Sequence, residues 1–219
     1  MELSYWQSRW KKDNTGWHME TVYPPLPKLW SHLSIDKNSR VLVPLCGKSR
    51  DMGWFLEQGH AVTGIETSTK AINELKEKYS GEFTKEQSHG FTIYTTDRLR
   101  LWQGDFLKLP SQQIESPAII YDKAAIVALP PAMRKEYAQK VLELCNPETQ
   151  ILLQTFEYEQ GEMNGPPFSV KEKEIRKLFG NSFSLNLLHE QPKFKELKKF
   201  QQRGLSSYLT EKIFLLTPP

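Results

Sequence analysis

Glu66 is the residue whose type and position most clearly allow it to bind a ligand. It follows Ala61–Ile65, a short apolar run that predicts a buried strand, and a similar run at Val41–Leu45 predicts another strand before it. Helix-spaced apolar residues within Asp51–Gln58 predict a helix between the two strands. In a doubly wound sheet, ligands bind outside the carboxyl ends of the strands, where a carboxylate can accept hydrogen bonds from both hydroxyls of a ribose. The stretch therefore predicts a βαβ unit for an adenosine-containing cofactor.

The turn between the first strand and the helix narrows the class of cofactor. It reads Cys46-Gly47-Lys48-Ser49 and contains one glycine, whereas a dinucleotide pyrophosphate needs the pattern G-x-G-x-x-G. The triphosphate-binding pattern G-x-x-x-x-G-K-[ST] is also absent, because no glycine stands before the Gly-Lys-Ser at that spacing. S-adenosylmethionine contains ribose and adenine but no phosphate. A turn with few glycines is therefore compatible with S-adenosylmethionine and less compatible with NAD or ATP.

The N-terminal 35 residues contain four of the six tryptophans, and three of them, Trp6, Trp10 and Trp17, stand close together near the start of the chain. Trp6 and Trp10 share one face of a helix that we expect from about Leu3 to Lys12. One interpretation is that these rings only pack a helical cap onto the domain. The other is a lid, because aromatic faces attract a sulfonium cation and a lid excludes water. His18 has no neighbours at metal-ligand spacing, so we interpret it as a hydrogen-bonded structural residue and expect no metal site.

Two further strand ends carry charged residues. Asp105 follows the predicted strand Leu99–Trp102, and Asp122-Lys123 ends the apolar run that begins at Pro117. Both positions are expected at the ligand edge of the sheet. Asp105 could instead cap a turn. Lys123 could instead form a salt bridge with Asp122 or another neighbouring acid.

Motifs along nearly the whole chain resemble the thiopurine S-methyltransferase family. They include Trp6-x-x-x-Trp10 with Thr15-Gly16-Trp17-His18, Val43-Pro44-Leu45-Cys46-Gly47-Lys48-Ser49, Gly59-His60, Gly64-x-Glu66, Tyr121-Asp122-Lys123-Ala124-Ala125 and Gly165-Pro166-Pro167-Phe168. The resemblance implies a class I methyltransferase that uses S-adenosylmethionine. It implies cofactor contacts from Trp6, Trp10, Leu45, Glu66, Asp105 and Lys123, and substrate contacts from Trp17 and Lys123. The family usually has arginine where Lys123 stands, and lysine lacks the planar fork of arginine.

The predicted fold is α/β: a doubly wound, mostly parallel, seven-stranded sheet with helices on both faces and a helical cap at residues 1–35. Ile151–Phe156 adds a central strand, and Phe183–Leu188 with Lys212–Leu216 fits a final antiparallel pair. The polar residues 81–90 are expected to form a loop. No repeat or long linker divides the chain, so residues 1–219 are predicted to form a single domain.

Two segments of the second half are candidates for substrate contact. Glu157–Phe168 contains two glycines and a double proline, which suits a loop over the site. The later basic run offers Lys198, Lys199 and Arg203, and its spacing does not identify which of them, if any, contacts the substrate. A charged run of this kind is also typical of a solvated face.

Composition limits the class of protein. The 219 residues carry a formal net charge of +3, which gives no strong basic surface for nucleic acid, and 38% are hydrophobic. Two cysteines offer no disulfide framework, and no apolar run is long enough to predict a membrane span or secretory signal. We therefore expect a cytoplasmic protein that binds neither membrane nor nucleic acid. The family resemblance implies a monomer.

The implied reaction is in-line transfer of a methyl group from S-adenosylmethionine to the sulfur of a thiopurine or related aromatic thiol. Bacterial-type members are also associated with selenium and tellurium compounds. A thiopurine thiol is substantially ionised at neutral pH, so we assign no general base. Two alternatives remain: an NAD-dependent oxidoreductase, which needs the missing glycines, and a non-catalytic adenosine- or RNA-binding module that stacks bases on tryptophans.

Overall fold

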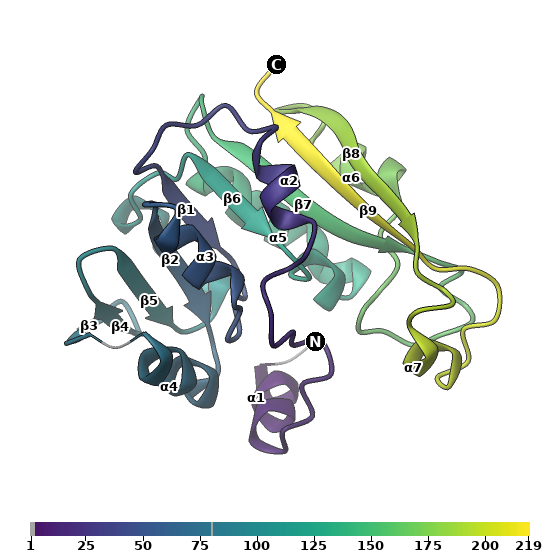
Figure 1. Ribbon diagram of the computed structural model, residues 1–219, viewed down its shortest axis with the longest axis horizontal. Helices are drawn as coiled ribbons and strands as arrows, with labels where there is room; N and C mark the ends of the chain where they lie inside the picture. The colour runs from purple at the N-terminus through teal and green to yellow at the C-terminus, as the bar shows by residue number, and fades with distance from the viewer. Residues whose placement is uncertain (1–2, 80) are drawn as a thin grey trace.

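The computed structural model describes residues 3–79 and 81–219 and contains one nine-stranded sheet (Figure 1). The strand order is β3-β4-β5-β2-β1-β6-β7-β9-β8. The strands are β1 (Arg40–Val43), β2 (Ala61–Glu66), β3 (Thr84–Ser88), β4 (Phe91–Thr95), β5 (Leu99–Gln103), β6 (Ile119–Asp122), β7 (Gln150–Glu157), β8 (Ser184–Pro192) and β9 (Thr210–Thr217). The helices are α1 (Leu3–Lys11), α2 (Leu26–Trp30), α3 (Asp51–Glu57), α4 (Thr69–Lys78), α5 (Pro131–Leu144), α6 (Glu172–Phe179) and α7 (Lys198–Gln201).

The α/β class is confirmed, but the expectation of seven strands is wrong. The five strands β5, β2, β1, β6 and β7 are parallel, and β9 and β8 continue the sheet antiparallel at one end. At the other end, β4 pairs antiparallel with β5, and β3 pairs antiparallel with β4. The polar segment expected as a loop contains β3. Because β3 is an edge strand with both faces largely exposed, it has no apolar alternation to predict it.

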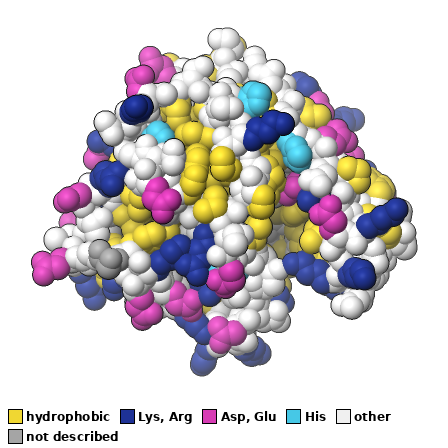
Figure 2. All heavy atoms as spheres, in the orientation of Figure 1, with side chains coloured by type: hydrophobic (Ala, Val, Ile, Leu, Met, Phe, Trp, Pro, Cys, Tyr) yellow, Lys and Arg dark blue, Asp and Glu magenta, His cyan; other side chains and the backbone are white. Residues whose placement is uncertain are grey.

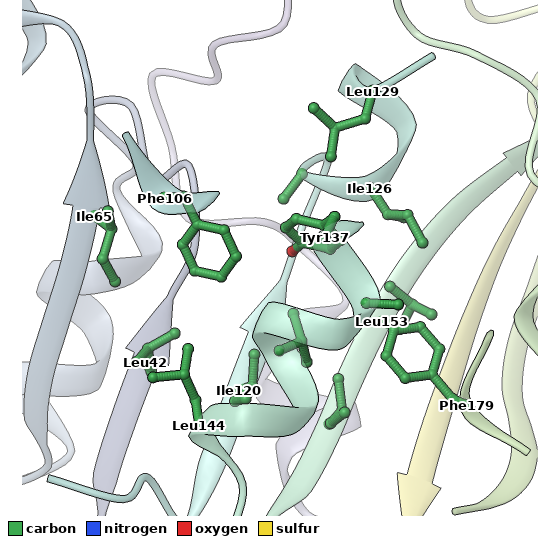
Figure 3. Close-up of a cluster of buried hydrophobic side chains, with 14 of the residues drawn as sticks. Leu42, Ile65, Phe106, Ile120, Ile126, Leu129, Tyr137, Leu144, Leu153 and Phe179 are labelled. Carbon is green, nitrogen blue, oxygen red and sulfur yellow. The ribbon is translucent and has the colours of Figure 1, made fainter. Parts of the chain in front are cut away.

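Helices cover both faces of the sheet, so the parallel strands are buried on both sides. On β1, Val41 and Val43 pack with Met52 and Phe55 of α3, in the layer that also holds α2 and α4. Leu42 points to the other face, where α5 and α6 lie; Figure 3 shows this second cluster around Tyr137 and Phe179. Burial on both faces explains why these strands read as continuous apolar runs.

The carboxyl ends of the parallel strands meet at one edge of the sheet. The chain runs from β1 to β2 on one side, while β6 pairs with β1 on the other, so β1 and β6 mark the point where the topology switches. Ligands of open α/β sheets bind at such a point. Helix α1 lies beyond this edge and contacts α4 (Figure 1).

Candidate functional site

The turn after β1 has a backbone that brings the chain close to the N-terminal cap. Leu45 and Gly47 both have positive φ values, 46° and 53°. A Cβ atom added at Gly47 would lie 3.1 Å from Cζ2 of Trp10, so glycine allows both the left-handed backbone and the close approach of this ring. The left-handed conformation is uncommon for leucine, which marks the turn as constrained.

Glu66 lies at the end of β2, with 5% of its surface exposed. Its Oε2 accepts a hydrogen bond from the Gly47 amide at 2.9 Å, and its Oε1 accepts one from the Ser68 amide at 2.7 Å. Burial raises the pKa of this carboxyl, and the amides of Ser68 and Gly47 act in the opposite direction. An ionised carboxylate offers about four acceptor positions, so the pair of oxygens fits the two hydroxyls of a ribose in addition to these amides.

Asp105 lies beside this end of β2. The Gly104 amide donates to the backbone oxygen of Glu66 at 2.9 Å, which joins the two strand ends. Asp105 is half-buried, and its Oδ1 accepts a hydrogen bond from the Leu107 amide at 3.1 Å as the N-cap of a 3₁₀ turn. The capping alternative is therefore present in the structure, and it leaves the other carboxylate oxygen available to a ligand.

The three N-terminal tryptophans form a cluster. The centroid of the Trp17 ring lies 5.3 Å from that of Trp6 and 5.8 Å from that of Trp10, both in edge-to-face geometry. Trp10 is buried and packs on the turn, whereas Trp6 and Trp17 are half-buried. Figure 2 shows a hollow in the surface between the part that holds α1 and the lobe that holds α7, with hydrophobic side chains along part of its wall.

Exposed ion pairs connect the cap to the rest of the chain. Asp13 lies 2.5 Å from Lys70 of α4, and Glu20 lies 2.9 Å from Arg50. Both acids are mostly exposed, and their pKa values are lowered, first of all by the hydrogen bonds from these cations. Salt screens such pairs, so they attach the cap only weakly.

His18 is part of the same segment. Its Nε2 lies 3.2 Å from Oε1 of Glu20, and burial together with the charge of Lys48 lowers its pKa. In residues 3–79 and 81–219, no group of three or more histidine, cysteine, aspartate or glutamate side chains is arranged to hold a metal ion.

Lys123 forms an ion pair, but with Asp51 rather than with its neighbour Asp122. Its Nζ lies 3.2 Å from Oδ2 of Asp51, which is 1% exposed at its side chain. Asp51 also accepts hydrogen bonds from the Tyr23 amide at 2.7 Å and the Tyr121 hydroxyl at 3.0 Å. The Lys123 ammonium lies 5.4 Å from the centroid of the Tyr23 ring. Asp51 therefore connects the cap, β6 and Lys123.

Asp122 has a different set of partners. Its Oδ1 accepts hydrogen bonds from the amides of Ala125 and Ile126, at 3.0 and 3.1 Å, and its Oδ2 accepts one from the Tyr137 hydroxyl at 2.8 Å. Burial raises the pKa of Asp122 to about 6, although these hydrogen bonds lower it. This carboxyl orders the segment after β6 and so places Lys123.

The basic run contacts backbone oxygens of neighbouring segments. Lys199 donates to the backbone oxygen of Gly16 in the cap. Arg203 donates to the backbone oxygen of Pro166 at 2.9 Å and to that of Asn164, which holds the loop between β7 and α6. Lys198 is exposed. Lys199 and Arg203 thus link the lobe of α7 to the cap and to the loop between β7 and α6.

Sequence reasoning assigned no site role to Asp51, Tyr23 or Glu211, although all three are buried, and Asp51 contacts both Lys123 and the Tyr23 amide. Their partners lie far away in sequence: Asp51 is 28 residues from Tyr23 and 70 from Tyr121. An apolar pattern carries no signal for such pairs. Asp51 follows Lys48-Ser49-Arg50 and Glu211 precedes Lys212, so both stand in polar surroundings in the sequence, which gave no signal that they are buried.

Comparison with known proteins agrees with this geometry. A chain from Corynebacterium glutamicum, a TehB-like SAM-dependent methyltransferase, has a TM-score of 0.59 at 13% identity, with 99% of this chain and 97% of that chain covered. A Burkholderia thailandensis 1,6-didemethyltoxoflavin-N1-methyltransferase, crystallised with S-adenosylhomocysteine, has a TM-score of 0.62 at 17% identity, covering 98% and 86%. These likenesses show the class I methyltransferase fold. No described helix has the length and apolar character needed to cross a membrane.

Sequence relatives are more specific. A thiopurine S-methyltransferase from Pseudomonas fluorescens is 38% identical over 216 residues, with 99% of each chain covered. A probable thiopurine S-methyltransferase from Yarrowia lipolytica is 41% identical over 201 residues, covering 90% of this chain and 94% of the relative. The family model for thiopurine S-methyltransferase matches residues 1–218. The chain therefore belongs to the thiopurine S-methyltransferase family.

Proposed function

We propose that this protein methylates the sulfur of thiopurines or related aromatic thiols, with S-adenosylmethionine as the methyl donor. Soft acceptors of the same kind, such as selenium and tellurium compounds, are included. The observation that carries the proposal is the placement of the Glu66 carboxylate at the switch point of the sheet, bound to the turn amides and next to a tryptophan cluster. The turn lacks the glycines that dinucleotide binding needs, which does not favour the oxidoreductase alternative. The family match favours neither the oxidoreductase nor the RNA-binding alternative.

The cofactor residues have separate roles. We propose that Glu66 accepts hydrogen bonds from the ribose hydroxyls, while Asp105, beside it, accepts one from the adenine amine. Leu45 covers the cofactor from the turn after β1. Trp6 and Trp10 enclose it from the cap, where their rings exclude water. When bound, S-adenosylmethionine supplies a methyl group on a positively charged sulfur.

The chain's part in the reaction is positioning and exclusion of water. When a thiolate meets a sulfonium, opposite charges neutralise, so an apolar site around the two reactants favours reaction over bulk water. Orientation of the reactants can lower the barrier by about 7 to 11 kcal/mol. Trp17 and Lys123 contact the acceptor in this proposal. No general base is assigned, because an acidic thiol reaches the site already ionised.

Lys123 provides the positive charge at the acceptor. Asp51 holds its ammonium at 3.2 Å, which fixes its place beside the Tyr23 ring. Lysine acts as a point charge with rotatable donors and does not give the two-point contact of an arginine. We therefore propose that Lys123 attracts the thiolate and leaves its orientation to other residues.

Calorimetric titration with S-adenosylhomocysteine tests the cofactor site. We expect wild type to bind and Glu66→Ala to bind at least about tenfold more weakly, as for loss of a hydrogen bond to a charged group. Glu77→Ala, which removes an exposed carboxylate of α4, is the matched control. Equal binding by wild type and Glu66→Ala would contradict the assignment of Glu66, and a wild type that binds but methylates no thiol would contradict the reaction.

Several broader properties belong to the same proposal. We propose that residues 1–219 form one domain in which residues 1–35 act as the cap. The protein works as a cytoplasmic monomer on small molecules, without nucleic acid or membrane. Size-exclusion chromatography with light scattering should give the mass of one chain, 25.5 kDa. A mass that rose toward that of a dimer with increasing concentration would contradict the proposal of a monomer.

A further inference from the structure

The lobe of α7, residues 193–209, is firmly joined to the loop between β7 and α6. Phe200 in the lobe is 5% exposed and packs in an apolar cluster with Tyr158, the first residue after β7. The Glu162 carboxylate of the loop accepts hydrogen bonds from two backbone amides of the lobe, at 2.8 and 2.9 Å. In the opposite direction, Arg203 donates to two backbone oxygens of the loop. The lobe and the loop therefore form one unit beyond the carboxyl end of β7.

The cap segment of residues 14–19 is held in a different way. The Trp17 ring packs against two tryptophan rings of α1, and the guanidinium carbon of Arg9 lies 5.4 Å from its centroid. A Cβ atom added at Gly16 would have no described atom within 4 Å beyond its chain neighbours, so the backbone is not packed there. The ring contacts of this segment thus lie inside the cap.

A hydrogen bond connects the lobe to this segment. Lys199 of α7 donates to the backbone oxygen of Gly16, which directly precedes Trp17. Among the residues that the structure describes, no other hydrogen bond or ion pair joins residues 14–19 to a residue beyond the cap. Helices α1 and α7 lie beyond the same edge of the sheet (Figure 1). The oxygen of Gly16 is a neutral acceptor, so this bond can break without the separation of two opposite charges.

We propose that Lys199 is a positioning residue that holds the cap closed over the acceptor by fixing Gly16 to the lobe. While the bond is made, the Trp17 ring next to Gly16 keeps a fixed position relative to the lobe. When it breaks, residues 14–19 can move away together with the cap, because the ring contacts of Trp17 lie inside the cap. The inference rests on the proposed function, in which Trp17 contacts the acceptor. It assigns Lys199 to the cap and not to the acceptor itself.

Amide hydrogen exchange of the protein without ligands tests the bond directly. The reporter is the His18 amide, which donates to the Thr15 oxygen at 2.8 Å and so exchanges only when this segment opens. In Lys199→Met, which keeps the apolar part of the side chain, we expect it to exchange about three to ten times faster than in wild type, as for loss of one hydrogen bond. Lys199→Arg should keep the wild-type rate, because a guanidinium also donates to a carbonyl oxygen.

A second amide and a second lysine provide the controls. The Leu205 amide donates to the Phe200 oxygen at 3.1 Å inside the lobe, and in Lys199→Met it should exchange as in wild type. Lys195→Met removes the charge of another exposed lysine of the lobe and should leave the exchange of both amides unchanged.

Steady-state kinetics connect the bond with methyl transfer. Loss of the bond lowers the fraction of protein whose cap is closed, which weakens the apparent affinity for the acceptor and leaves the closed complex as it was. With 6-mercaptopurine as the acceptor, we therefore expect Lys199→Met to raise KM about three- to tenfold and to change kcat by less than about twofold. Lys199→Arg should restore the KM of wild type.

Several outcomes would overturn the inference. Unchanged exchange of the His18 amide in Lys199→Met, with or without a raised KM, would show that Lys199 does not hold the cap. Equal acceleration at Leu205 would show a structural role in the lobe, and equal acceleration in Lys195→Met a general effect of charge. Faster exchange at His18 with an unchanged KM would show a cap contact that does not position the acceptor. If wild type methylated no thiol, the proposed function would fail, while the exchange rates would still show whether Lys199 holds the cap.

Discussion

Two sets of carboxylates surround the ligand edge of the sheet, and they are held in opposite ways. Asp51, Glu66 and Asp122 are buried, and each accepts hydrogen bonds from backbone amides or buried hydroxyls. Asp13 and Glu20 are exposed and bind Lys70 and Arg50 across the boundary of the cap. The buried set builds the edge itself, while the exposed set attaches a segment to it.

The energetic consequences of the two sets differ. A buried carboxylate whose partners are removed costs several kcal/mol, whereas exposed pairs are screened by solvent and salt. The cofactor edge is therefore expected to be rigid and the first part of the cap to be loosely attached. Such a division suits a site that must admit two substrates and then exclude water.

Asp51→Ala should give the largest effect. The substitution leaves the Lys123 ammonium, the Tyr121 hydroxyl and the Tyr23 amide without their shared partner. We expect the free energy of unfolding, measured by urea denaturation, to fall by about 3 to 5 kcal/mol. Ser49→Ala, which removes a hydroxyl that hydrogen-bonds to Asp51, is the matched control and should cost much less. If Asp51→Ala lowered the free energy of unfolding no more than the control does, the contrast between buried and exposed carboxylates would be contradicted.

The sequence predicted most of the edge because its strands and turn are local features. Two apolar runs with a helix between them placed Glu66 at the end of β2. Just beyond it, Ser68 is the N-cap of α4, and its side chain accepts a hydrogen bond from the Ala71 amide. The edge strand β3 was missed because both of its faces are largely exposed. The sequence signal for its hairpin was Gly90, because two-residue hairpin turns favour glycine, and in the structure His89 and Gly90 both have positive φ.

The contacts around Lys123 could not be predicted in the same way. An ion pair was considered for Lys123, but its partner Asp51 begins α3 and is 72 positions away. The partners of the basic run could not be predicted either, because Lys199 and Arg203 donate to backbone oxygens, and every residue has a backbone oxygen. Sequence patterns report which residues are buried, and they do not report which distant polar groups meet.

Asp122, one of the buried carboxylates, should make the stability of the protein depend on pH. Its pKa is raised from 3.8 to about 6 by burial, so the folded state binds the proton more tightly than the unfolded state. The resulting stability is fully present below pH 3.8 and is lost as the pH rises through about 6. Relative to Asp122→Asn, which has no such titration, wild type should lose about 2 kcal/mol of unfolding free energy between pH 4.5 and 7.

Urea denaturation of both proteins at several pH values measures this difference and cancels the titration of other groups. Asp97→Asn, at an exposed position of the β4–β5 turn, should run parallel to wild type at each pH. If the difference between wild type and Asp122→Asn were independent of pH, or grew with rising pH, Asp122 would not belong with the buried set.

Lys70→Ala should give the smallest effect, because it removes only the exposed pair with Asp13. We expect its thermal midpoint to equal that of wild type within the scatter of the measurement, and its affinity for S-adenosylhomocysteine to change less than threefold. Lys135→Ala, at an exposed position of α5, is the control. A fall in stability similar to that of Asp51→Ala would mean that exposed charges hold the cap in place, and not the buried hydrogen bonds of Asp51 with Tyr23 and Tyr121. The buried and the exposed carboxylates would then not differ in their contribution to stability.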